Sequence, residues 1–297
     1  MVSPDMEIKN FTKKFGKRVA VDNLSFSLPK GSIAGFVGPN GAGKTTTIRA
    51  LAGHLHPTEG EVRILGTDPW DLTVEQKRQV AYVSESMNIP GWMTPARAIR
   101  FNQSFYPAWD HELAERLLQE FDLAEAADFA NLSTGQKRRT AILLALCQNA
   151  DLFIMDEPAS GLDVSARHGF LEHILNLACE GNRTVLISSH LLSDLERIID
   201  RVVFLHRGRL TLEGSLDDLK ARVRELHLPV QISKADVERF FYTIRHETKG
   251  DETIAVVSNY SEQAFQALCQ EFQCAEGAGQ SGFNLEDLFV QMDQSLK

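Results

Sequence analysis

The sequence has no apolar run long enough to cross a bilayer as a helix. None of its segments approaches the roughly 20 consecutive apolar residues that such a helix needs. The longest candidate, residues 141–147, is short and is flanked by Arg139 and Gln148. The start of the chain also lacks the basic residues and the apolar core of a secretory signal. We therefore expect a cytosolic chain, or one that a partner protein holds at a membrane.

Cysteine is scarce, and its spacing argues against the common cysteine frameworks. The four cysteines, Cys147, Cys179, Cys269 and Cys274, form no Cys-X-X-Cys pair and have no histidine cluster beside them. Zinc sites and disulfide scaffolds usually show such spacings. Cys269 and Cys274 are about one and a half helical turns apart, so we expect them on different faces of a helix. The pattern favours reduced thiols over a metal site or a disulfide.

Basic residues are outnumbered by acidic ones. The chain has 31 Lys and Arg residues against 40 Asp and Glu residues, a net charge of -9 at pH 7. Proteins that coat nucleic acid need a basic surface. We therefore expect no nucleic-acid partner, although a local basic patch is compatible with these totals. The 297 residues suffice for one large domain, or for a large and a small one.

The larger, N-terminal part of the chain has the pattern of an α/β domain. Residues 6–16 and 21–31 alternate apolar and polar side chains like paired strands. Residues 32–38 form a continuous apolar run, which predicts a buried central strand. Two further apolar runs, residues 152–155 and 184–188, predict more strands. Strands of this kind alternating with helices indicate a largely parallel sheet.

A helical insertion interrupts this domain at about residues 87–150. Its sequence is helical in character and is broken at Pro107, and Asp110 is placed to cap the helix that follows. After the insertion and the two further strands, a hairpin is predicted to turn at Arg207 and Gly208.

The character of the sequence changes after Gly214. A charged helix is predicted at residues 215–226, followed by a hairpin and two more helices, which together indicate a small α+β appendage. We therefore expect one domain over residues 1–215 and an accessory domain over residues 216–297. Nothing in the residues of the appendage indicates its role.

The segment after the first buried strand has the pattern of a phosphate-binding loop. GPNGAGKT, at residues 38–45, matches Gly-X-X-X-X-Gly-Lys-Thr between a predicted strand and a predicted helix. Glycines let backbone N–H groups approach phosphate oxygens, and the helix points the positive end of its dipole at the anion. Lys44 adds a charge for the outer phosphates, and the Thr45 hydroxyl can bind Mg²⁺. The residues expected to contact a nucleotide are Gly38, Pro39, Asn40, Gly41, Ala42, Gly43, Lys44, Thr45 and Thr46.

Two other predicted strands are followed by side chains suited to phosphate chemistry. Asp156 and Glu157 follow residues 152–155, and His190 follows residues 184–188. The carboxyl ends of strands in a doubly wound sheet meet where ligands bind. We expect Asp156 to hold Mg²⁺, directly or through water, and Glu157 to polarise an attacking water as a general base. His190 is expected to hydrogen-bond the γ-phosphate and to hold Glu157 in place.

A second stretch with the pattern of an anion site, LSTGQKRRT, lies at residues 132–140, far from the glycine-rich loop. Together GPNGAGKTT, LSTGQ, LFIMDEP, SGLD and His190 resemble the nucleotide-binding subunit of an ABC (ATP-binding cassette) transporter. The resemblance covers approximately residues 5–215. It implies the P-loop NTPase fold of ABC ATPases, with an antiparallel β subdomain and the helical insertion. LSTGQ matches the signature motif of that family, except that Thr134 stands where the family normally has a second glycine.

The resemblance accounts for two anion-binding stretches in one chain. In the family, two chains bind head to tail, and the signature motif of one chain caps the γ-phosphate held by the glycine-rich loop of the other. It implies that Ser133, Gly135 and Gln136 contact ATP bound to a second chain, and that Asp163 of SGLD crosses the dimer interface. ATP, Mg²⁺ and a homodimer, or a heterodimer with a second ABC ATPase, are therefore expected.

The same resemblance assigns roles to Phe15 and Glu85. Phe15 stands where the family places an aromatic ring against adenine, a contact worth roughly 1–3 kcal/mol by analogy with base stacking. An ordinary strand aromatic is the alternative for this position. Glu85 replaces the glutamine that usually ends its segment, and exporter-type relatives often show the same glutamate. A carboxylate there can ligate Mg²⁺ with Thr45 and Asp156, although it adds repulsion near the γ-phosphate.

The function implied is that of an ATPase that drives a separately encoded membrane permease. The pattern FYPAWD and the final NLEDLFV resemble bacterial exporter-type cassettes, which implies export and a place at the cytoplasmic face of the inner membrane. Phe101 and Phe105 are one helical turn apart, and we expect them to pack inside the helical insertion. A groove for a helix of the permease is the alternative.

Two other functions fit the sequence less well. An ABC-type ATPase outside transport, such as a translation or DNA-repair factor, usually has two cassettes in one chain or long coiled coils. This chain has one cassette and no heptad run. A catalytically dead regulatory subunit is disfavoured because Lys44, Asp156, Glu157 and His190 are all present. The residues of this chain indicate neither the cargo nor the identity of the permease.

Overall fold

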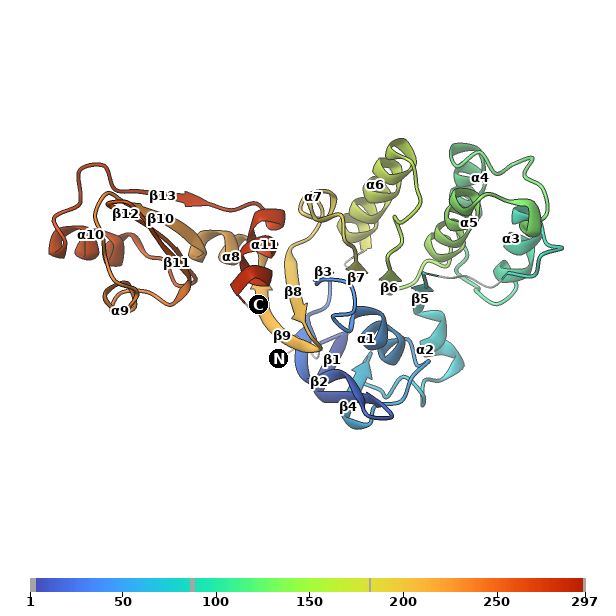
Figure 1. The fold of residues 1–297 in the computed structure, drawn as a ribbon. Coiled ribbons are helices and arrows are strands. Elements are labelled where there is room, and N and C mark those ends of the chain that lie inside the picture. The colour runs from blue at the N-terminus through green and yellow to red at the C-terminus, as the bar shows by residue number, and fades with distance from the viewer. Residues whose placement is uncertain (1–3, 86–88, 182, 296–297) are drawn as a thin grey trace. The chain divides into compact units, whose positions relative to one another are not determined.

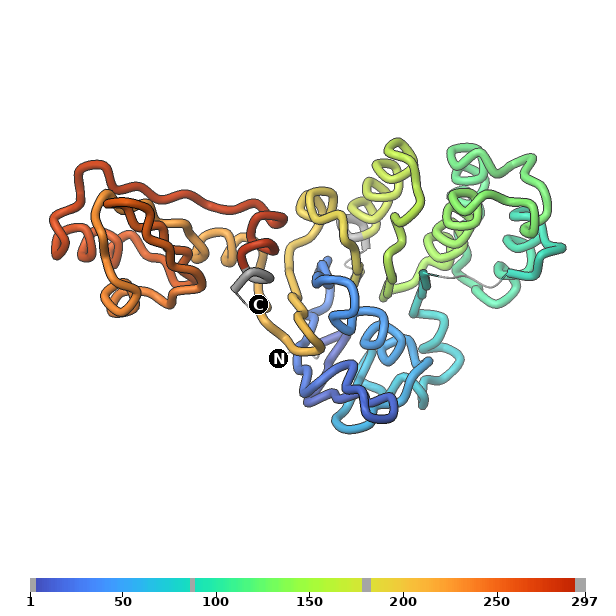
Figure 2. The backbone as a smooth tube through the Cα atoms, in the orientation of Figure 1, coloured from blue at the N-terminus to red at the C-terminus, as the bar shows by residue number. Residues whose placement is uncertain are grey.

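The structure is a computed structural model and describes residues 4–85, 89–181 and 183–295. Figures 1 and 2 show its ribbon and its backbone trace. The chain divides into two compact units, Met1–Leu212 and Glu213–Lys297. The division falls within strand β9 (Arg209–Ser215), whose last residue is where the sequence placed the end of the first domain.

The first unit opens with a three-stranded antiparallel sheet in the order β2-β1-β4. The turn between its first two strands contains Gly16, whose φ of 57° is a left-handed conformation that glycine adopts at little cost. Met6, Ile8 and Phe11 of β1 are buried because one face of the sheet covers a core. The strands are β1 (Met6–Phe15), β2 (Arg18–Leu28) and β4 (Glu59–Ile64).

A six-stranded sheet in the order β5-β6-β7-β3-β8-β9 forms the centre of the unit. Its first five strands pair in parallel, so their carboxyl ends lie at one edge. Every residue of β3, β6 and β7 is buried, as expected for strands covered on both faces. The strands are β3 (Ile33–Val37), β5 (Val80–Val83), β6 (Leu152–Asp156), β7 (Thr184–Ser188), β8 (Arg201–His206) and β9.

Helices cover both faces of this sheet, with α1 on one side and α6 and α7 on the other in Figure 1. Side chains of α1 share one core with the antiparallel sheet and with β3, β6, β7 and β8. The predicted hairpin at Arg207 and Gly208 is confirmed, since both residues have positive φ between β8 and β9. These helices are α1 (Lys44–Leu51), α2 (Val74–Arg78), α6 (Val164–Gly181) and α7 (Leu192–Leu195).

In the described residues from 89 to 150, the predicted helical insertion contains three α-helices and a short 3-10 helix. Asp110 caps α4 as predicted, because its carboxylate accepts a hydrogen bond of 2.8 Å from the N–H of Leu113. The apolar residues 141–147 belong to α5 and its cap, and all are buried in the core. Of the described helices, none combines the length and the apolar character that crossing a bilayer requires. The elements are α3 (Pro95–Gln103), α4 (His111–Glu120), η1 (Phe129–Asn131) and α5 (Thr134–Leu146).

The expected packing of Phe101 and Phe105 inside the insertion is wrong. Phe101 is 55% exposed and Phe105 is 50% exposed, and their rings contact each other with centroids 5.1 Å apart. Helix α3 buries a different face, which carries Ala98 and Ile99. Trp109, four residues after Phe105, is buried.

The second unit has an antiparallel sheet in the order β11-β12-β10-β13 and its own core. The predicted helix at residues 215–226 is too long. It ends at Arg222, and Leu226 and Leu228 alternate into the core on a central strand. The strands are β10 (Arg224–Leu228), β11 (Thr243–Lys249), β12 (Glu252–Val257) and β13 (Gly279–Gly282). The helices are α8 (Leu216–Arg222), α9 (Lys234–Val237), α10 (Glu262–Glu271) and α11 (Leu285–Ser295).

Cys269 and Cys274 do not point away from each other as expected. The chain reverses after α10 through Gln273, whose φ is 52°, and the N–H of Cys274 then bonds the carbonyl of Cys269 at 3.0 Å. Both side chains are buried in the same core. Cys147, Cys269 and Cys274 are free thiols, as predicted, and the side chain of Cys179 lies outside the described residues.

Candidate nucleotide-binding site

The glycine-rich loop joins the carboxyl end of β3 to the start of α1. Gly41 and Gly43 have φ values of 81° and 105°, which residues with side chains rarely adopt. A Cβ atom at Gly38 would collide with the backbone carbonyl of Leu205. Each of these three glycines is therefore required by the backbone path of the loop itself.

Lys44 lies at the first position of α1 and reaches back over the loop. Its Nζ donates a hydrogen bond of 2.6 Å to the carbonyl of Gly38. Only 7% of the residue is exposed, and burial lowers the pKa of its ammonium group. The carboxylates of Glu157, Asp156 and Glu85 act in the opposite direction. The ammonium group is thus surrounded by three acidic side chains at the edge of the sheet.

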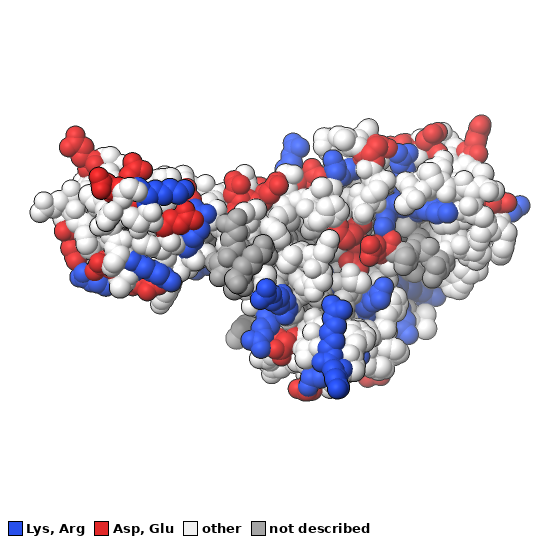
Figure 3. Space-filling model, viewed as in Figure 1, with Lys and Arg blue, Asp and Glu red and all other residues white. Residues whose placement is uncertain are grey.

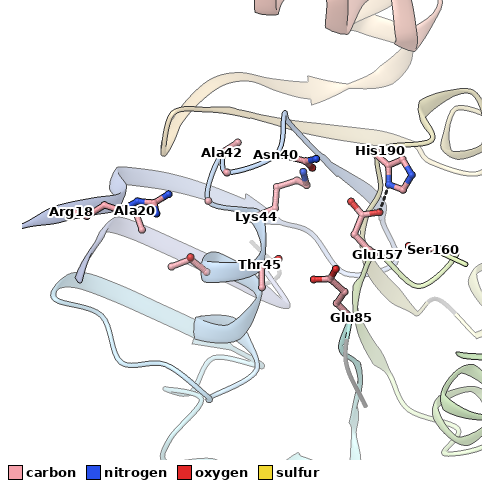
Figure 4. Close-up of a pocket in the computed structure, with 13 residues that line it drawn as sticks. Arg18, Ala20, Asn40, Ala42, Lys44, Thr45, Glu85, Glu157, Ser160 and His190 are labelled. Carbon is pink, nitrogen blue, oxygen red and sulfur yellow. Dashed lines mark hydrogen bonds and ion pairs between the residues drawn. The ribbon is translucent and has the colours of Figure 1, made fainter. Parts of the chain in front are cut away.

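The loop borders a cavity of about 340 Å³ (Figure 4). Glu157 and His190 face Lys44 and Thr45 across it, and Glu85 lies beside Thr45. The structure therefore gathers residues from widely separated parts of the sequence. The lining residues are Arg18, Ala20, Asn40, Gly41, Ala42, Gly43, Lys44, Thr45, Thr46, Glu85, Glu157, Ser160 and His190.

Glu157 and His190 form a close polar pair in this cavity wall. His190 Nδ1 lies 2.7 Å from Glu157 Oε2. Glu157 has a φ of 48°, and its N–H donates to the hydroxyl of Ser188 at 2.9 Å. That hydroxyl in turn donates to Asp156 at 2.8 Å. The hydroxyl at the end of β7 therefore connects both acidic residues at the end of β6.

The oxygen donors at this site suit Mg²⁺. The Thr45 hydroxyl and the Glu85 carboxylate line the cavity, and the Asp156 carboxylate is near enough to act on Lys44. Mg²⁺ prefers oxygen ligands and is commonly held by one or two carboxylates with substrate phosphates and waters. Within the described ranges, no group of three or more His, Cys, Asp or Glu side chains forms a metal cage. The residues present fit an ion that enters with a nucleotide.

Asp156 and Phe15 are not among the described residues that line the cavity. Asp156 is 1% exposed and lies beneath the surface. Phe15 is 51% exposed, with the Lys13 ammonium 5.4 Å from its ring centroid. Its cross-strand partner Arg18 lines the cavity instead.

The LSTGQ stretch forms the start of α5. The Ser133 hydroxyl accepts a hydrogen bond from the N–H of Gln136 at 3.2 Å, and the Gln136 side chain accepts one from the N–H of Ser133 at 3.0 Å. This reciprocal capping fixes the helix start, where free backbone N–H groups favour an anion. Ser133, Gly135 and Gln136 are not among the described residues that line the cavity of the same chain.

Asp163 directly precedes α6 and lies close to α5. The N–H of Ala166, 2.9 Å from its carboxylate, and the side chain of Arg139 hold its pKa below the ordinary value. Arg139 and Asp163 form an ion pair that links α5 to the segment before α6. Asp163 is exposed and is also outside the described cavity lining.

Three lining residues were missed in the sequence: Arg18, Ala20 and Ser160. The pairing of Phe15 with Arg18 across a tight turn could have indicated that residues after the turn also approach the loop. Ser160 follows the DEP segment closely, but no pattern marks it. These positions depend on how the antiparallel sheet approaches the glycine-rich loop.

Residues 21–160 match the family model described as ABC transporter. The bacitracin transport ATP-binding protein BcrA of Bacillus licheniformis is 32% identical over 272 residues, covering 88% of each chain. The probable multidrug ABC transporter ATP-binding protein YbhF of Escherichia coli is 34% identical over 73% of this chain. The chain spans only 38% of the length of YbhF.

A similar solved structure is a dimeric ATP-binding cassette in a post-hydrolysis state with ADP and phosphate bound. It is 26% identical, has a TM-score of 0.62, and covers 71% of this chain and 98% of its own. Its fold agrees with the predicted P-loop NTPase core of an ABC ATPase. With the glycine-rich loop, Glu157 and His190 in one cavity wall, the chain belongs to the ATP-binding proteins of the ABC transporter family, whose cassettes are ATPases.

Proposed function

We propose that the chain hydrolyses ATP to ADP and phosphate as the nucleotide-binding subunit of an ABC transporter. One observation carries the proposal: the glycine-rich loop and Glu157 border the same cavity, and the Glu157 carboxylate is 2.7 Å from His190. The loop provides backbone N–H groups and Lys44 for the phosphates. Glu157 provides a base at the opposite wall.

Hydrolysis requires a water molecule in line with the γ-phosphate. Glu157 accepts the proton of this water as its oxygen bonds to the γ-phosphorus, and the bond to the bridging oxygen breaks so that ADP departs. A general base of this kind contributes about 10²–10⁴-fold in rate. Because His190 turns Nδ1 to Glu157, its Nε2 is the nitrogen available to the γ-phosphate.

Mg²⁺ is proposed to bind with the nucleotide and to neutralise the charge that develops on the phosphate oxygens. Thr45 and Glu85 would hold it from the cavity wall, and Asp156 would act through water because it is buried. The loop residues from Gly38 to Thr46 are proposed to bind the phosphates. Phe15 is exposed and pairs across the strands with Arg18, which lines the cavity. This position suits a ring that contacts adenine when ATP is bound.

The chain is proposed to dimerise head to tail around two ATP molecules. Ser133, Gly135 and Gln136 lie at a helix start suited to an anion, yet they are outside the described lining of the cavity in their own chain. A second copy, or a related ABC ATPase, would place them on the γ-phosphate. Asp163 would cross the interface, as the family resemblance implies.

Glu157→Gln tests the role of the base. We expect the variant to bind ATP, to lose at least about a hundredfold in hydrolysis, and to accumulate as a dimer with ATP and Mg²⁺ on size exclusion. Glu115→Gln, an exposed glutamate on α4, is the matched control and should behave as wild type. A monomeric Glu157→Gln chain with unchanged turnover would contradict the proposal.

The permease is proposed to dock on the helical insertion. Trp92, Phe101 and Phe105 are 63%, 55% and 50% exposed and all belong to this insertion. Exposed aromatic side chains on one segment are typical of a protein–protein surface. Docking there would hold the chain peripherally at the cytoplasmic face of the inner membrane, and the resemblance to exporter-type cassettes supports export.

Purification in detergent from the native membrane tests this part of the proposal. A multi-span membrane protein should be retained with the wild-type chain and lost from a Phe101→Ser, Phe105→Ser double variant. Trp70→Ser, at a half-exposed aromatic outside the insertion, is the control. Retention of ribosomes or DNA in place of a membrane protein would favour the non-transport alternative.

A nucleic-acid partner is not part of the proposal. On the face shown in Figure 3, the first unit carries both basic and acidic side chains. The net charge of -9 also opposes binding to a polyanion.

A further inference from the structure

Arg138 contacts the backbone of Ser84 and Glu85, and the proposed hydrolysis assigns no role to this contact. Its guanidinium donates to the carbonyl of Ser84 at 2.7 Å through one nitrogen and to the carbonyl of Glu85 at 2.6 Å through the other. The two carbonyls are consecutive, so the planar fork of the side chain matches them together. Arg138 is on α5 and the carbonyls directly follow β5, more than fifty residues away in the sequence.

This contact is buried, which makes it unusual for a charged side chain. Arg138 is 8% exposed, and burial lowers its pKa, while the carboxylates of Glu85, Asp156 and Glu157 act in the opposite direction. A buried guanidinium is retained only where hydrogen bonds and nearby opposite charge compensate its desolvation. Those compensating charges are the same carboxylates that surround Lys44 in the cavity.

The contact fixes the backbone that carries Glu85. The Glu85 side chain lines the cavity beside Thr45, whereas its carbonyl faces Arg138. An exposed residue after the end of a strand would otherwise be free to turn. Anchoring two successive carbonyls restricts the backbone angles that set the direction of the side chain.

We propose that Arg138 is a positioning residue that holds Glu85 at the Mg²⁺ side of the ATP cavity by fixing the backbone of Ser84 and Glu85 to α5. The inference rests on the proposed ATPase function and deepens it. Arg138 does not line the cavity in the described part of the chain, so it acts through Glu85 and not on the nucleotide.

A double-mutant cycle tests this role in the full-length chain. Arg138→Gln should lower kcat about tenfold and change the KM for ATP less than about twofold, because the loop that binds ATP is untouched. In a chain that already carries Glu85→Ala, adding Arg138→Gln should lower kcat by less than about twofold relative to Glu85→Ala alone. Arg138→Lys keeps the charge and loses the fork, so it should show the same pattern with a smaller loss.

A second readout separates positioning from general destabilisation. The Mg²⁺ concentration for half-maximal activity should rise several-fold in Arg138→Gln and Arg138→Lys. It should stay at the wild-type value in Arg116→Gln, the matched removal of an exposed arginine from α4. Unfolding midpoints of all variants show which of them are folded at the assay temperature.

Three outcomes would overturn the inference. If Arg138→Gln lowers kcat equally in the wild-type chain and in the Glu85→Ala background, Arg138 acts only on stability or through another group. A wild-type Mg²⁺ requirement in both Arg138 variants would also exclude the role. If the wild-type chain hydrolyses no ATP under conditions in which it is folded, the proposed function fails and this inference fails with it.

Discussion

At the scale of single residues, Ser188 supports the acidic pair of the site. Glu157 has a left-handed backbone, a conformation that costs a residue with a side chain about 1–3 kcal/mol. The Ser188 hydroxyl accepts the N–H of Glu157 and donates to Asp156. It therefore stabilises the strained turn that carries Glu157 and orients the Asp156 carboxylate.

We predict that Ser188→Ala lowers kcat about tenfold with little change in the KM for ATP, because Glu157 loses its orientation. The unpaired N–H should also lower the free energy of unfolding by about 1–3 kcal/mol. Steady-state kinetics and denaturant unfolding measure the two effects. Ser32→Ala is the control, since Ser32 is also buried and its hydroxyl donates to the carbonyl of Pro29 at 2.7 Å, away from the acidic pair. Equal kcat values for the two variants would contradict the role of Ser188.

At the scale of elements, the start of α5 has a structural role as a capped helix start, and we propose that it also binds ATP held by a second chain. We predict that Ser133→Ala destabilises the fold by about 1 kcal/mol through the lost cap. Ser261→Ala at the start of α10 removes a comparable cap and should cost a similar amount. Only Ser133→Ala should also weaken ATP-dependent dimerisation, measured by sedimentation with ATP and Mg²⁺. If the two variants dimerise equally, Ser133 serves only as the cap of α5 and has no role in dimerisation.

Elements with a local chemical signal could be predicted from the sequence. The glycine-rich loop, the cap at Asp110 and the turn at Arg207 each depend on residues within one turn of the chain. The end of α8 was not predicted. Leu226 and Leu228 alternate as in a strand, but two residues do not indicate a strand until β12 and β13 are known to pair with β10.

Contacts between distant segments could not be predicted in the same way. Phe101 and Phe105 have the spacing of a buried helical face, and only the packing of α3 shows that another face is buried. In the sequence, Arg138 is simply one residue of LSTGQKRRT, the stretch that has the pattern of an anion site. Its bonds to Ser84 and Glu85 depend on α5 lying against the end of β5.

At the scale of the whole molecule, the two units have separate cores. Units with their own cores commonly unfold independently. We predict two transitions in calorimetry, and we predict that ATP with Mg²⁺ raises only the transition of Met1–Leu212, because all described lining residues lie there. An equal shift of both transitions would show that the units unfold as one.

Ser133 of one copy is proposed to complete the ATP cavity of another. Chains with Ser133→Arg and chains with Lys44→Ala should each be inactive, because each variant damages one half of every composite site. Mixed in equal amounts, they should recover roughly a quarter of wild-type ATPase activity, since half of the dimers would contain one intact site. Activity no higher than that of either variant alone, in a preparation whose wild-type chain is active, would contradict the claim.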